Sequence, residues 1–599
     1  MDNKRNVAII AHVDHGKTTI LNEILKESVK TEHIDKSTIN VDSNKLEQER
    51  GITILSKPTG ITYKNHQITI VDTPGHADFG GEVERIMNMV DGVILVVDSY
   101  EGVMPQTRFV LKKAIEANLK PIVVINKMDK AEHREQEVLE EIIELFMDLN
   151  ATDDQLDFKV LYASGVKGVC SLESDFNTMN KGLSLLLDLI ISEIKPPQGE
   201  LDKPFLFQPS LLDYNDYVGR IGVGVIKNGK VKEGEIVKVL RYDGKKEEFR
   251  VLKIFKYSLL NQIEVKEAEA GDVIAIAGLS DINVGETIGK GDFEALPLIK
   301  LDSPTIKITI AVNSSPFLGQ DGNLLTARMI KDRLLKEQEK DVALKVEQLD
   351  SNSFLVSGRG ELHLGILIEN MRREGFEMEV SKPQVIYKEE DGKILEPFEI
   401  LSMECPNDSV GTIIEKLGTR GATLTKMNAK LEYTDLEYLI PSRGLMGFTN
   451  NFLSYTKGYG IISHRFEKYL PKLNLNLGER VNGVMISLNS GKATAYDMQG
   501  LEERGIMFVE PGTDVYEGMI VGEHNSNNDL VVNVTKGKAL TNMRAAGSDH
   551  TVILKKKRAI TLEYSLDYIN SDELVEVTPK NIRLRKKYLT ELERRRHRS

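Results

Sequence analysis

Residues 6–18 read Asn6-Val-Ala-Ile-Ile-Ala-His-Val-Asp-His-Gly-Lys-Thr18 and decide the fold of the N-terminal third. The first half is apolar, as in a buried strand, and the second half is polar and ends where an amphipathic segment begins. In a P-loop, the backbone N–H groups of such a turn and of the following helix wrap phosphates. We therefore expect a phosphate-binding turn at Ala11–Thr18, although the usual first glycine is Ala11 here. The structural alternative is a Lys-Thr helix start after an ordinary turn.

The last side chains of this turn predict what it binds. Lys17 would reach the β- and γ-phosphates of a nucleotide, and the Thr18 hydroxyl would bind Mg²⁺. The neighbouring residues would add contacts to the phosphates. The expected phosphate-binding set is Asp14, His15, Gly16, Lys17, Thr18 and Thr19.

A second motif, Asp72-Thr-Pro-Gly-His76, follows an apolar strand. Asp72 would hold Mg²⁺ through a water molecule, as Walker-B aspartates do. Gly75 carries no side chain, so its N–H can face the γ-phosphate. A capped Pro-Gly turn is the structural alternative for this motif taken alone.

Two motifs predict recognition of guanine. In Asn126-Lys-Met-Asp129, Asp129 would accept hydrogen bonds from guanine N1–H and the 2-amino group. Adenine lacks this donor pair, so a buried carboxylate would stay unpaired against it. Ser164-Gly-Val166 is weaker and would offer a backbone N–H to guanine O6. The expected contacts, with Lys127 over the base and Asn126 bracing the loop, are Asn126, Lys127, Met128, Asp129, Ser164 and Gly165.

A fifth motif, Arg50-Gly-Ile-Thr-Ile54, lies in a polar stretch upstream of Asp72. Thr53 would give Mg²⁺ a second hydroxyl and sense the γ-phosphate, as the switch loops of GTPases do. A polar turn or a strand edge could explain any one of these motifs alone. Their order, each after a strand or in a connecting loop, predicts a domain that binds and hydrolyses GTP. Its metal ligands would be Thr18, Thr53 and Asp72.

Residues 1–200 alternate apolar strands with amphipathic helices, which predicts a parallel sheet covered on both faces. The Pro-rich break at Lys195–Gly199 then predicts a linker. The expected strands are 6–13, 68–71, 92–98, 121–126 and 159–162. The expected helices are 17–28, 82–89, 106–118, 132–149 and 182–194.

The remaining chain predicts four more domains. Short strands and glycine turns predict a β-barrel at 201–298. Two successive βαββαβ patterns predict ferredoxin-like domains at 299–390 and 391–475. Residues 478–579 are rich in Gly, Asn and short apolar runs, which favours a β-rich C-terminal domain at 476–599 with no clear helix before Leu562. The predicted fold class is a multidomain α/β chain: P-loop GTPase domain, β-barrel, two ferredoxin-like α+β domains and a β-rich C-terminal domain.

The composition is that of an ordinary globular protein, with 41% hydrophobic and 28% charged residues among 599. Cys170 and Cys405 fit no paired spacing, which favours two reduced core thiols. No apolar run approaches the ~18 residues of a membrane span, and the start lacks the apolar core of a signal peptide. We expect a cytoplasmic monomer without membrane contact.

The charge distribution is uneven. The whole chain carries a net charge of −13, yet residues 580–599 hold nine Lys/Arg and two Glu. Such an asymmetry favours a basic arm that neutralises RNA phosphates, with a solvated terminal helix as the alternative. A polar loop within 523–550 is a second candidate, although a plain surface loop explains it almost as well. The expected RNA contacts are Lys536, Lys538, Arg544, Arg583, Arg585, Lys586 and Lys587.

These motifs resemble the translational GTPases, relatives of elongation factors Tu and G. The resemblance is carried by 12–18, 50–54 and 72–76, and by Ser357-Gly-Arg-Gly-Glu-Leu-His-Leu364, which is similar to the third domain of elongation factor G. The C-terminal third resembles the BipA (TypA) subgroup. The matching stretches are Pro441–Phe448, Gly491–Tyr496, Lys536–Arg544 and Asp572–Lys580.

The resemblance implies GTP hydrolysis stimulated by the ribosome, and a role in assembling the large (50S) subunit under cold or stress. It implies contact with rRNA, and it leaves contact with tRNA and binding of ppGpp open. By motif position, His76 would orient the attacking water, and Val13 and Ile52 would form an apolar gate. Lys17 and Thr53 would complete the catalytic set.

Gly165 departs from the family, which usually has Ala there. Two other functions stay open: a translation factor that acts in each elongation cycle, similar to LepA, and a non-catalytic RNA-binding protein. The absence of room for a further domain between Val385 and Glu396 favours the BipA-like reading over the first. The complete set of nucleotide residues argues against the second.

Overall fold

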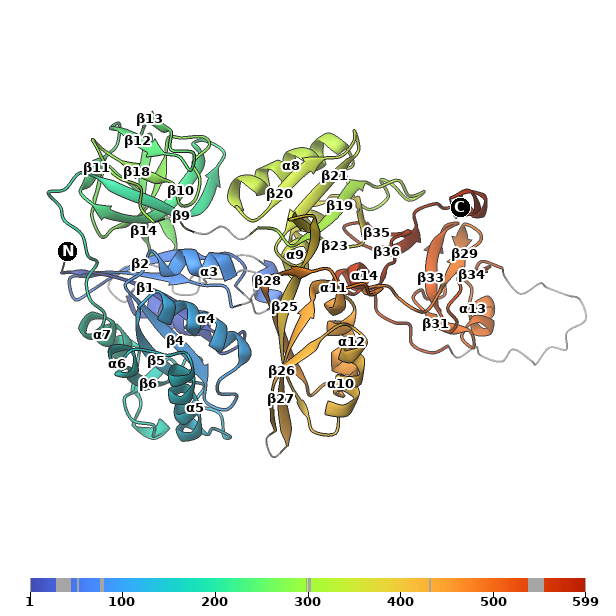
Figure 1. Ribbon diagram of the computed structural model, residues 1–599, viewed down its shortest axis with the longest axis horizontal. Coiled ribbons are helices and arrows are strands. Elements are labelled where there is room, and N and C mark those ends of the chain that lie inside the picture. Colours follow the sequence, from blue (N-terminus) through green and yellow to red (C-terminus); the bar gives the residue numbers. More distant parts are fainter. Residues whose placement is uncertain are drawn as a thin grey trace, which may run out of the picture. The chain divides into compact units, whose positions relative to one another are not determined.

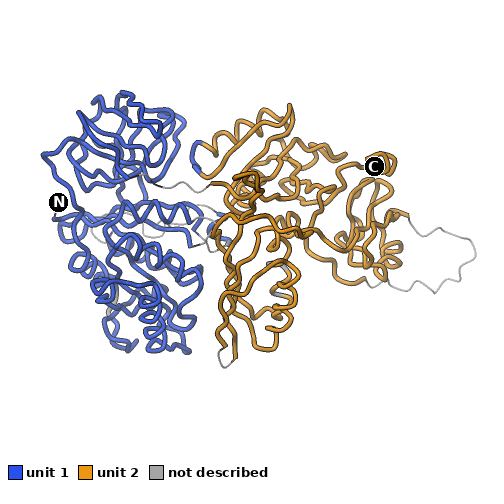
Figure 2. The backbone as a smooth tube through the Cα atoms, in the orientation of Figure 1, with its two compact units in different colours: residues 1–302, 339–342 blue, residues 303–338, 343–599 orange. Residues whose placement is uncertain are grey.

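The computed structural model describes residues 2–28, 45–50, 53–75, 80–297, 299, 303–429, 432–536 and 554–597. The chain forms two compact units, Met1–Asp302 with Glu339–Val342 and Ser303–Gln338 with Ala343–Ser599 (Figure 2). Among the described residues, no helix is both long and apolar enough to cross a membrane.

The first unit begins with an eight-stranded sheet in the order β2-β3-β1-β4-β5-β6-β7-β8 (Figure 1). The five strands from β3 to β6 run parallel, and antiparallel β2, β7 and β8 extend the two edges. The strands are β1 (Lys4–Ala11), β2 (Lys57–Tyr63), β3 (His66–Asp72), β4 (Gly92–Asp98), β5 (Lys120–Asn126), β6 (Lys159–Ser164), β7 (Val169–Ser171) and β8 (Asn180–Lys181). The helices are α1 (Lys17–Ser28), α2 (Lys45–Arg50), α3 (Gly80–Met87), α4 (Pro105–Glu116), α5 (Glu135–Asp148), α6 (Asp153–Leu156) and α7 (Ser184–Glu193).

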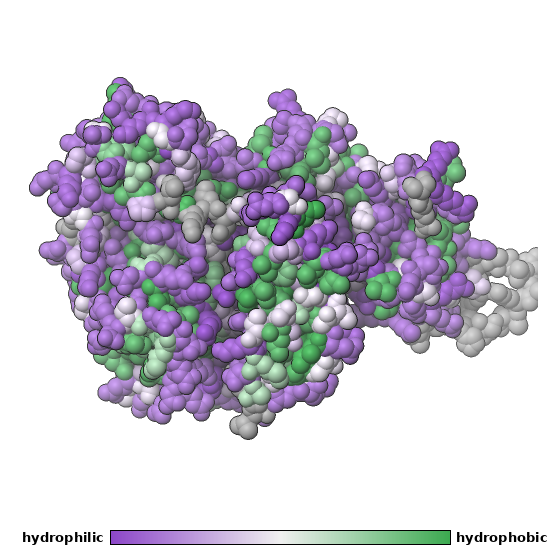
Figure 3. Space-filling view, viewed as in Figure 1, coloured by the Kyte–Doolittle hydropathy of each residue, from purple (hydrophilic) through white to green (hydrophobic). Residues whose placement is uncertain are grey.

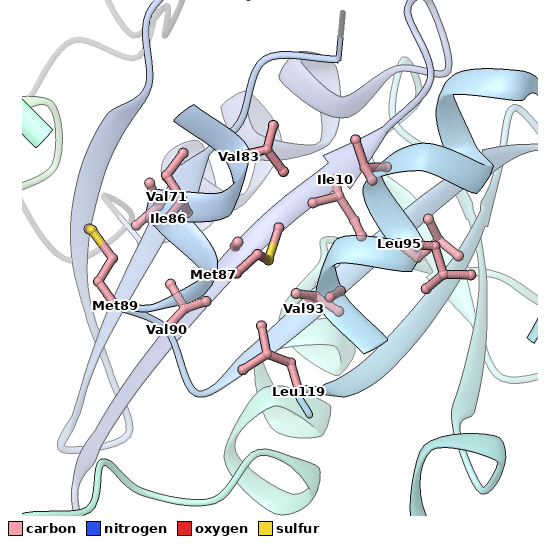
Figure 4. Packing of buried hydrophobic residues seen from close by; sticks show 14 of the residues in the cluster. Ile10, Val71, Val83, Ile86, Met87, Met89, Val90, Val93, Leu95 and Leu119 are labelled. Carbon is pink, nitrogen blue, oxygen red and sulfur yellow. The ribbon is translucent and has the colours of Figure 1, made fainter. Parts of the chain in front are cut away.

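Alternation along β1 divides the core of this domain between the two sheet faces. Val7 and Ile9 pack with α1 and α7, whereas Ala8 and Ile10 pack with α3, α4 and α5. Figure 4 shows part of the second cluster, in which Val83 and Ile86 of α3 lie over the sheet. The predicted parallel sheet covered on both faces is confirmed. The antiparallel edge strands were missed, because polar residues interrupt their apolar pattern.

A β-barrel follows, with its strands in the order β13-β12-β18-β9-β10-β17-β14-β15 and a separate β11–β16 pair. Val223 and Ala275, on β10 and β17, join the core that contains α3, so the barrel packs directly on the GTPase domain. Gly60 of β2 also exchanges two backbone hydrogen bonds with Leu259, of 3.2 and 2.6 Å. The strands are β9 (Leu206–Asn215), β10 (Gly219–Asn228), β11 (Lys230–Lys232), β12 (Ile236–Leu240), β13 (Lys246–Arg250), β14 (Lys253–Ser258), β15 (Asn261–Val265), β16 (Glu267–Glu269), β17 (Val273–Ala277) and β18 (Thr287–Gly289).

The second unit contains two βαββαβ folds. In each, the four strands lie in the spatial order 4-1-3-2, the ferredoxin-like arrangement. The first comprises β19 (Ile306–Val312), α8 (Ala327–Lys340), β20 (Lys345–Gln348), β21 (Ser353–Gly358), α9 (Glu361–Glu374) and β22 (Met378–Ser381), followed by short β23 (Gln384–Val385) and β24 (Lys388–Glu390). The second comprises β25 (Lys393–Pro406), α10 (Val410–Gly418), β26 (Thr423–Ala429), β27 (Tyr433–Pro441), α11 (Ser442–Leu445), α12 (Phe448–Tyr455) and β28 (Ile461–Pro471).

Two short helices, α11 and α12, precede β28. Gly447 separates them with a φ of 70°, a left-handed conformation that ends a helix. In the space-filling view, apolar side chains gather over this second ferredoxin-like domain (Figure 3). Ile414, Leu424 and Met427 are exposed there.

The C-terminal part shares its sheet with the first ferredoxin-like domain. β22 pairs antiparallel with β35, and β36, β33, β29 and β34 continue the same sheet. The two parts also share one apolar core. The strands are β29 (Val484–Ser487), β30 (Gly491–Lys492), β31 (Gly505–Met507), β32 (Asp514–Val515), β33 (Met519–His524), β34 (Leu530–Val532), β35 (Glu573–Val577) and β36 (Ile582–Lys586). The helices are α13 (Ala495–Leu501), α14 (Leu562–Tyr568) and α15 (Glu591–Arg596).

The β-rich character of this part is confirmed, but the expectation of no helix before Leu562 is wrong. Thr494 caps α13 by accepting a hydrogen bond from the Asp497 N–H, and this short cap-and-turn signal carries little apolar periodicity. Cys170 and Cys405 are both buried and free, as expected.

Candidate nucleotide-binding site

The turn between β1 and α1 has the backbone of a phosphate-binding loop. Asp14 and Gly16 adopt positive φ angles of 62° and 91°. A Cβ at Gly16 would lie 2.3 Å from the side-chain nitrogen of Asn126, so glycine is needed there. The turn leads directly into α1, whose first N–H groups have no acceptor within the helix and are available to an anion.

Lys17, Thr53 and Asp72 meet in one buried cluster. Lys17 Nζ donates a 2.6 Å hydrogen bond to Thr53 Oγ1 and forms an ion pair with Asp72. Thr53 Oγ1 in turn donates to Asp72 Oδ2 at 3.1 Å. The three residues come from the phosphate turn, from the segment before β2 and from the end of β3. The structure therefore brings together side chains that the sequence assigned to phosphate and metal binding.

The oxygen atoms of this cluster fit a hard divalent cation. Hydroxyl and carboxylate oxygens are the donors that Mg²⁺ prefers. Here the ammonium group of Lys17 contacts both Thr53 and Asp72, so a positive charge already compensates the fully buried carboxylate. Thr18 follows Lys17 at the start of α1. In the part of the chain that the structure describes, no cluster of three His, Cys, Asp or Glu side chains offers another metal site.

Asp129 is oriented by a hydroxyl from the neighbouring loop. Ser164 Oγ donates to Asp129 Oδ1 at 2.6 Å, and the Lys167 N–H donates to the same hydroxyl at 3.3 Å. Asn126 Oδ1 accepts a 3.0 Å hydrogen bond from the Gly165 N–H. The loops after β5 and β6 are thereby held together. The predicted base-side residues do lie side by side.

Two groups predicted to contact the base are engaged in contacts within the protein. The Met128 side chain is buried in the apolar core of the domain. The Gly165 N–H is already bonded to Asn126. A Cβ at Gly165 would lie 3.3 Å from side-chain carbons of Ile20 and Thr19, so alanine would be tight at this position.

Asp98, at the end of β4, is a residue of this site that the sequence reasoning missed. It lies 2.7 Å from Lys127 Nζ and 3.1 Å from Lys130 Nζ. Burial acts to raise the pKa of Asp98, but the two lysines and a backbone N–H lower that pKa to about 2. Asp98 thus holds Lys127 beside the base loop. The available signal was its position after an apolar strand, at the same sheet edge as Asp72.

The His15 ring is engaged within the protein. It is fully buried, and Nδ1 accepts a 3.2 Å hydrogen bond from the Asp98 N–H. Nε2 lies 3.2 Å from Glu101 Oε2, and this contact lowers the pKa of Glu101. The ring is therefore engaged by Asp98 and Glu101, and only the backbone of His15 is left for the phosphate contact that the sequence predicts.

The residues expected to control hydrolysis are only partly described. His76 and Ile52 lie outside the described residues. The Val13 N–H donates to Gln106 Oε1 at 3.2 Å, which ties the phosphate turn to α4. A Cβ at Gly75 would lie 3.1 Å from a backbone oxygen of that turn, so the backbone of residue 75 approaches it closely.

The exposed basic arm expected at the C-terminus is not formed by Arg583, Arg585 and Lys586. All three lie on β36, where neighbouring strands and loops supply carboxylates. Arg583 contacts Glu576 at 3.0 Å and Asp321 at 3.2 Å. The other partners are Glu379 for Arg585, and Asp529, Asp572 and Glu573 for Lys586. A count of charges along the sequence could not reveal partners that arrive from distant elements.

Two of the remaining basic candidates are exposed, namely Lys536 and Lys587. Lys538 and Arg544 lie outside the described residues. The run Lys555-Lys-Lys-Arg558 was missed, although four consecutive cations are a plain signal. Its three lysines are exposed, so they are better placed than β36 to meet a phosphate backbone.

Family comparisons agree with the order of domains along the chain. Residues 2–196 match the elongation factor Tu GTP binding domain, and 219–289 match elongation factor Tu domain 2. Residues 393–474 match the elongation factor G C-terminus, and 482–591 match the TypA/BipA C-terminal domain.

Whole-chain relatives include proteins named large ribosomal subunit assembly factor BipA. The chain is 51% identical to that of Bacillus subtilis (strain 168) over 596 residues, covering 98% of this chain and 97% of the relative. It is 50% identical to that of Synechocystis sp. over 588 residues (97% and 98%) and 48% identical to that of Escherichia coli (strain K12) over 596 residues (99% and 98%).

A crystal structure from Thermus thermophilus has a similar fold, with a TM-score of 0.55 at 17% identity, covering 79% of this chain and 98% of that one. The identity to the whole-chain relatives extends over nearly the full length of both proteins. This chain is therefore a GTPase that belongs to the BipA (TypA) family of translational GTPases.

Proposed function

We propose that this GTPase acts on the ribosome, in assembly of the large subunit. The observation that carries the proposal is an identity of 48–51% over nearly the whole chain to proteins named for that activity. The buried Lys17–Thr53–Asp72 cluster supports an active nucleotide site rather than a vestigial one. If this were a non-catalytic RNA-binding protein, the high identity to the BipA proteins and the buried cluster would each need a separate explanation.

In this proposal, GTP binding separates Lys17 from Asp72 and Thr53. The Lys17 ammonium group then binds β- and γ-phosphate oxygens of GTP. The oxygens of Thr18, Thr53 and Asp72 would hold Mg²⁺, which would supply positive charge at the phosphates. Asp129, oriented by Ser164, accepts the two guanine donors. Thr53 reports whether the γ-phosphate is present.

Hydrolysis depends on His76, which would orient the attacking water. Val13 and Ile52 would form an apolar gate that keeps His76 away until the ribosome docks. Intrinsic turnover is then slow, and ribosomes accelerate it. His76→Ala should abolish the ribosome-stimulated turnover but leave GTP binding intact. Equal stimulated rates in the variant and the parent would remove His76 from this role.

Ribosome profiles of a strain lacking the protein test the assembly role. Large-subunit precursors should accumulate, most strongly in the cold. Normal subunits with slowed elongation would instead favour a factor that acts in each elongation cycle. Co-sedimentation with ribosomes and with separate subunits, in GDP, a non-hydrolysable GTP analogue or ppGpp, defines the binding state. The same assay with tRNA-loaded ribosomes tests tRNA contact, and we expect the free protein to sediment as a monomer.

A further inference from the structure

A buried carboxylate holds the chain directly after Thr53. Glu47 lies on α2 and its side chain is 1% exposed. Its Oε1 accepts hydrogen bonds from the N–H groups of Ile54 at 2.9 Å and Leu55 at 3.2 Å. Its Oε2 accepts a 2.8 Å hydrogen bond from Lys57 Nζ. Both oxygens of one carboxylate are thus committed to a four-residue stretch.

A second carboxylate completes this clamp from α3. Glu82 Oε1 accepts a 3.0 Å hydrogen bond from the Ser56 N–H. Burial raises the pKa of Glu82, whereas Arg85 and Ser56 act to lower it. Three consecutive N–H groups, at 54, 55 and 56, therefore point at acidic side chains of two helices. The Ile54 bond is buried and the Leu55 and Ser56 bonds are partly buried, and a charged acceptor strengthens each of them.

Thr53 is the residue that this clamp positions. Its hydroxyl is buried and lies 2.6 Å from Lys17 Nζ, in the cluster with Asp72. Since Ile54 is bonded to Glu47, residue 53 has little freedom at its C-terminal side. We propose that Glu47 is a positioning residue that keeps Thr53 within reach of the γ-phosphate and so raises the affinity for GTP without raising that for GDP. This inference rests on the proposed role of Thr53.

The physical reason for selectivity is that GDP has no γ-phosphate. A Thr53 contact contributes binding energy only with GTP, whereas the phosphate turn and the base loops contact both nucleotides. An interaction that differs between two ligands is the only kind that changes their ratio of affinities. Losing the Glu47 clamp should thus weaken GTP binding selectively, because freeing residues 54 and 55 adds the entropic cost of ordering them again.

The test measures the affinities of full-length protein for a non-hydrolysable GTP analogue and for GDP, both with Mg²⁺. Glu47→Ala should raise the Kd of the analogue about tenfold or more and change that of GDP less than about twofold. Glu47→Gln keeps one acceptor oxygen but loses the charge facing Lys57, so its selective loss should be smaller, about threefold. Glu140→Ala, at an exposed position of α5, is the control for removing a glutamate and should change neither value.

A parallel Thr53→Ala variant separates this inference from the role of Thr53. If Thr53→Ala leaves the ratio of affinities unchanged, the role of Thr53 itself fails. If Thr53→Ala shifts the ratio and neither Glu47 variant does, the positioning role of Glu47 is refuted and the role of Thr53 is retained. An equal loss of both nucleotides in the Glu47 variants also overturns it, because that is the signature of a general structural role. Should Glu47→Ala fail to fold, Glu47→Gln decides alone by the same ratio.

Discussion

The side-chain nitrogen of Asn126 donates a 2.9 Å hydrogen bond to the carbonyl oxygen of His15, 111 residues away. The oxygen of the same amide accepts a 3.0 Å hydrogen bond from the Gly165 N–H. One side chain therefore joins the phosphate turn to both loops on the base side. In the proposed function these loops bind the two ends of the nucleotide, so the amide would couple their positions.

Asn126→Ala should lower the affinity for GTP and the affinity for GDP to the same extent. We expect a loss of about 30- to 160-fold in affinity for each, because two buried hydrogen bonds contribute about 1–1.5 kcal/mol apiece. Titration with fluorescent forms of GDP and of a non-hydrolysable GTP analogue measures both. Asn88→Ala, at an exposed position after α3, is the control. A loss confined to one nucleotide would contradict the coupling.

Asp129→Asn should lower the affinity for guanine nucleotides and favour xanthine nucleotides. The amide presents a donor where guanine also presents donors, whereas xanthine offers a carbonyl oxygen there. Ser164→Ala removes only the 2.6 Å hydrogen bond that orients Asp129, so the affinity should fall several-fold without a change of base preference. Competition between GDP and XDP measures both effects. An unchanged preference in Asp129→Asn would take Asp129 out of the site.

Asp91 should make the first unit less stable as the pH rises. Burial raises the pKa of Asp91 from 3.8 to about 6, with Lys227 and Arg5 opposing part of the shift. Between these values the folded protein keeps a proton that the unfolded chain has released. The resulting stabilisation is complete below pH 4 and is lost as the pH rises through 6.

The size of this effect is at most about 3 kcal/mol, since one pKa unit corresponds to about 1.4 kcal/mol. Asp91→Asn should remove the decline and raise the unfolding temperature at pH 8 more than at pH 4. Calorimetric scans at several pH values measure it. A variant that unfolds at the same temperature as the parent at pH 8 would contradict the assignment.

Arg583→Met should destabilise the protein without changing its contact with RNA. The substitution leaves the carboxylates of Glu576 and Asp321 without this partner, and breaking such a buried pair costs about 3–5 kcal/mol. By contrast, replacing Lys555, Lys556 and Lys557 with serine should leave the unfolding temperature unchanged. It should flatten the salt dependence of rRNA binding, because the slope follows the number of phosphates neutralised. Thermal scans and binding titrations at several salt concentrations distinguish the structural role from the RNA-binding role. The reverse pattern would assign the RNA contact to β36.

The sequence by itself determined the class of the nucleotide site. Its motifs are short and contiguous, and the strands and helices that hold them have strong periodic patterns. Helix α1 and strand β4 occur at the residues predicted from that pattern, 17–28 and 92–98. Because parallel strands end at one edge of a sheet, the order of the motifs sufficed to bring Lys17 and Asp72 together.

Only the tertiary structure decided which side chains pair across long distances. The bonds from Asn126 to His15 and from Lys127 to Asp98 join separate loops, and neither spacing nor composition predicts them. The pairing of β22 with β35 likewise unites two regions that the sequence treats as separate domains. For the same reason, C-terminal cations that the sequence assigned to RNA binding form ion pairs within the protein. A cation binds RNA or completes a buried ion pair according to which carboxylates the fold brings to it, and for Arg583 the fold brings Glu576 and Asp321.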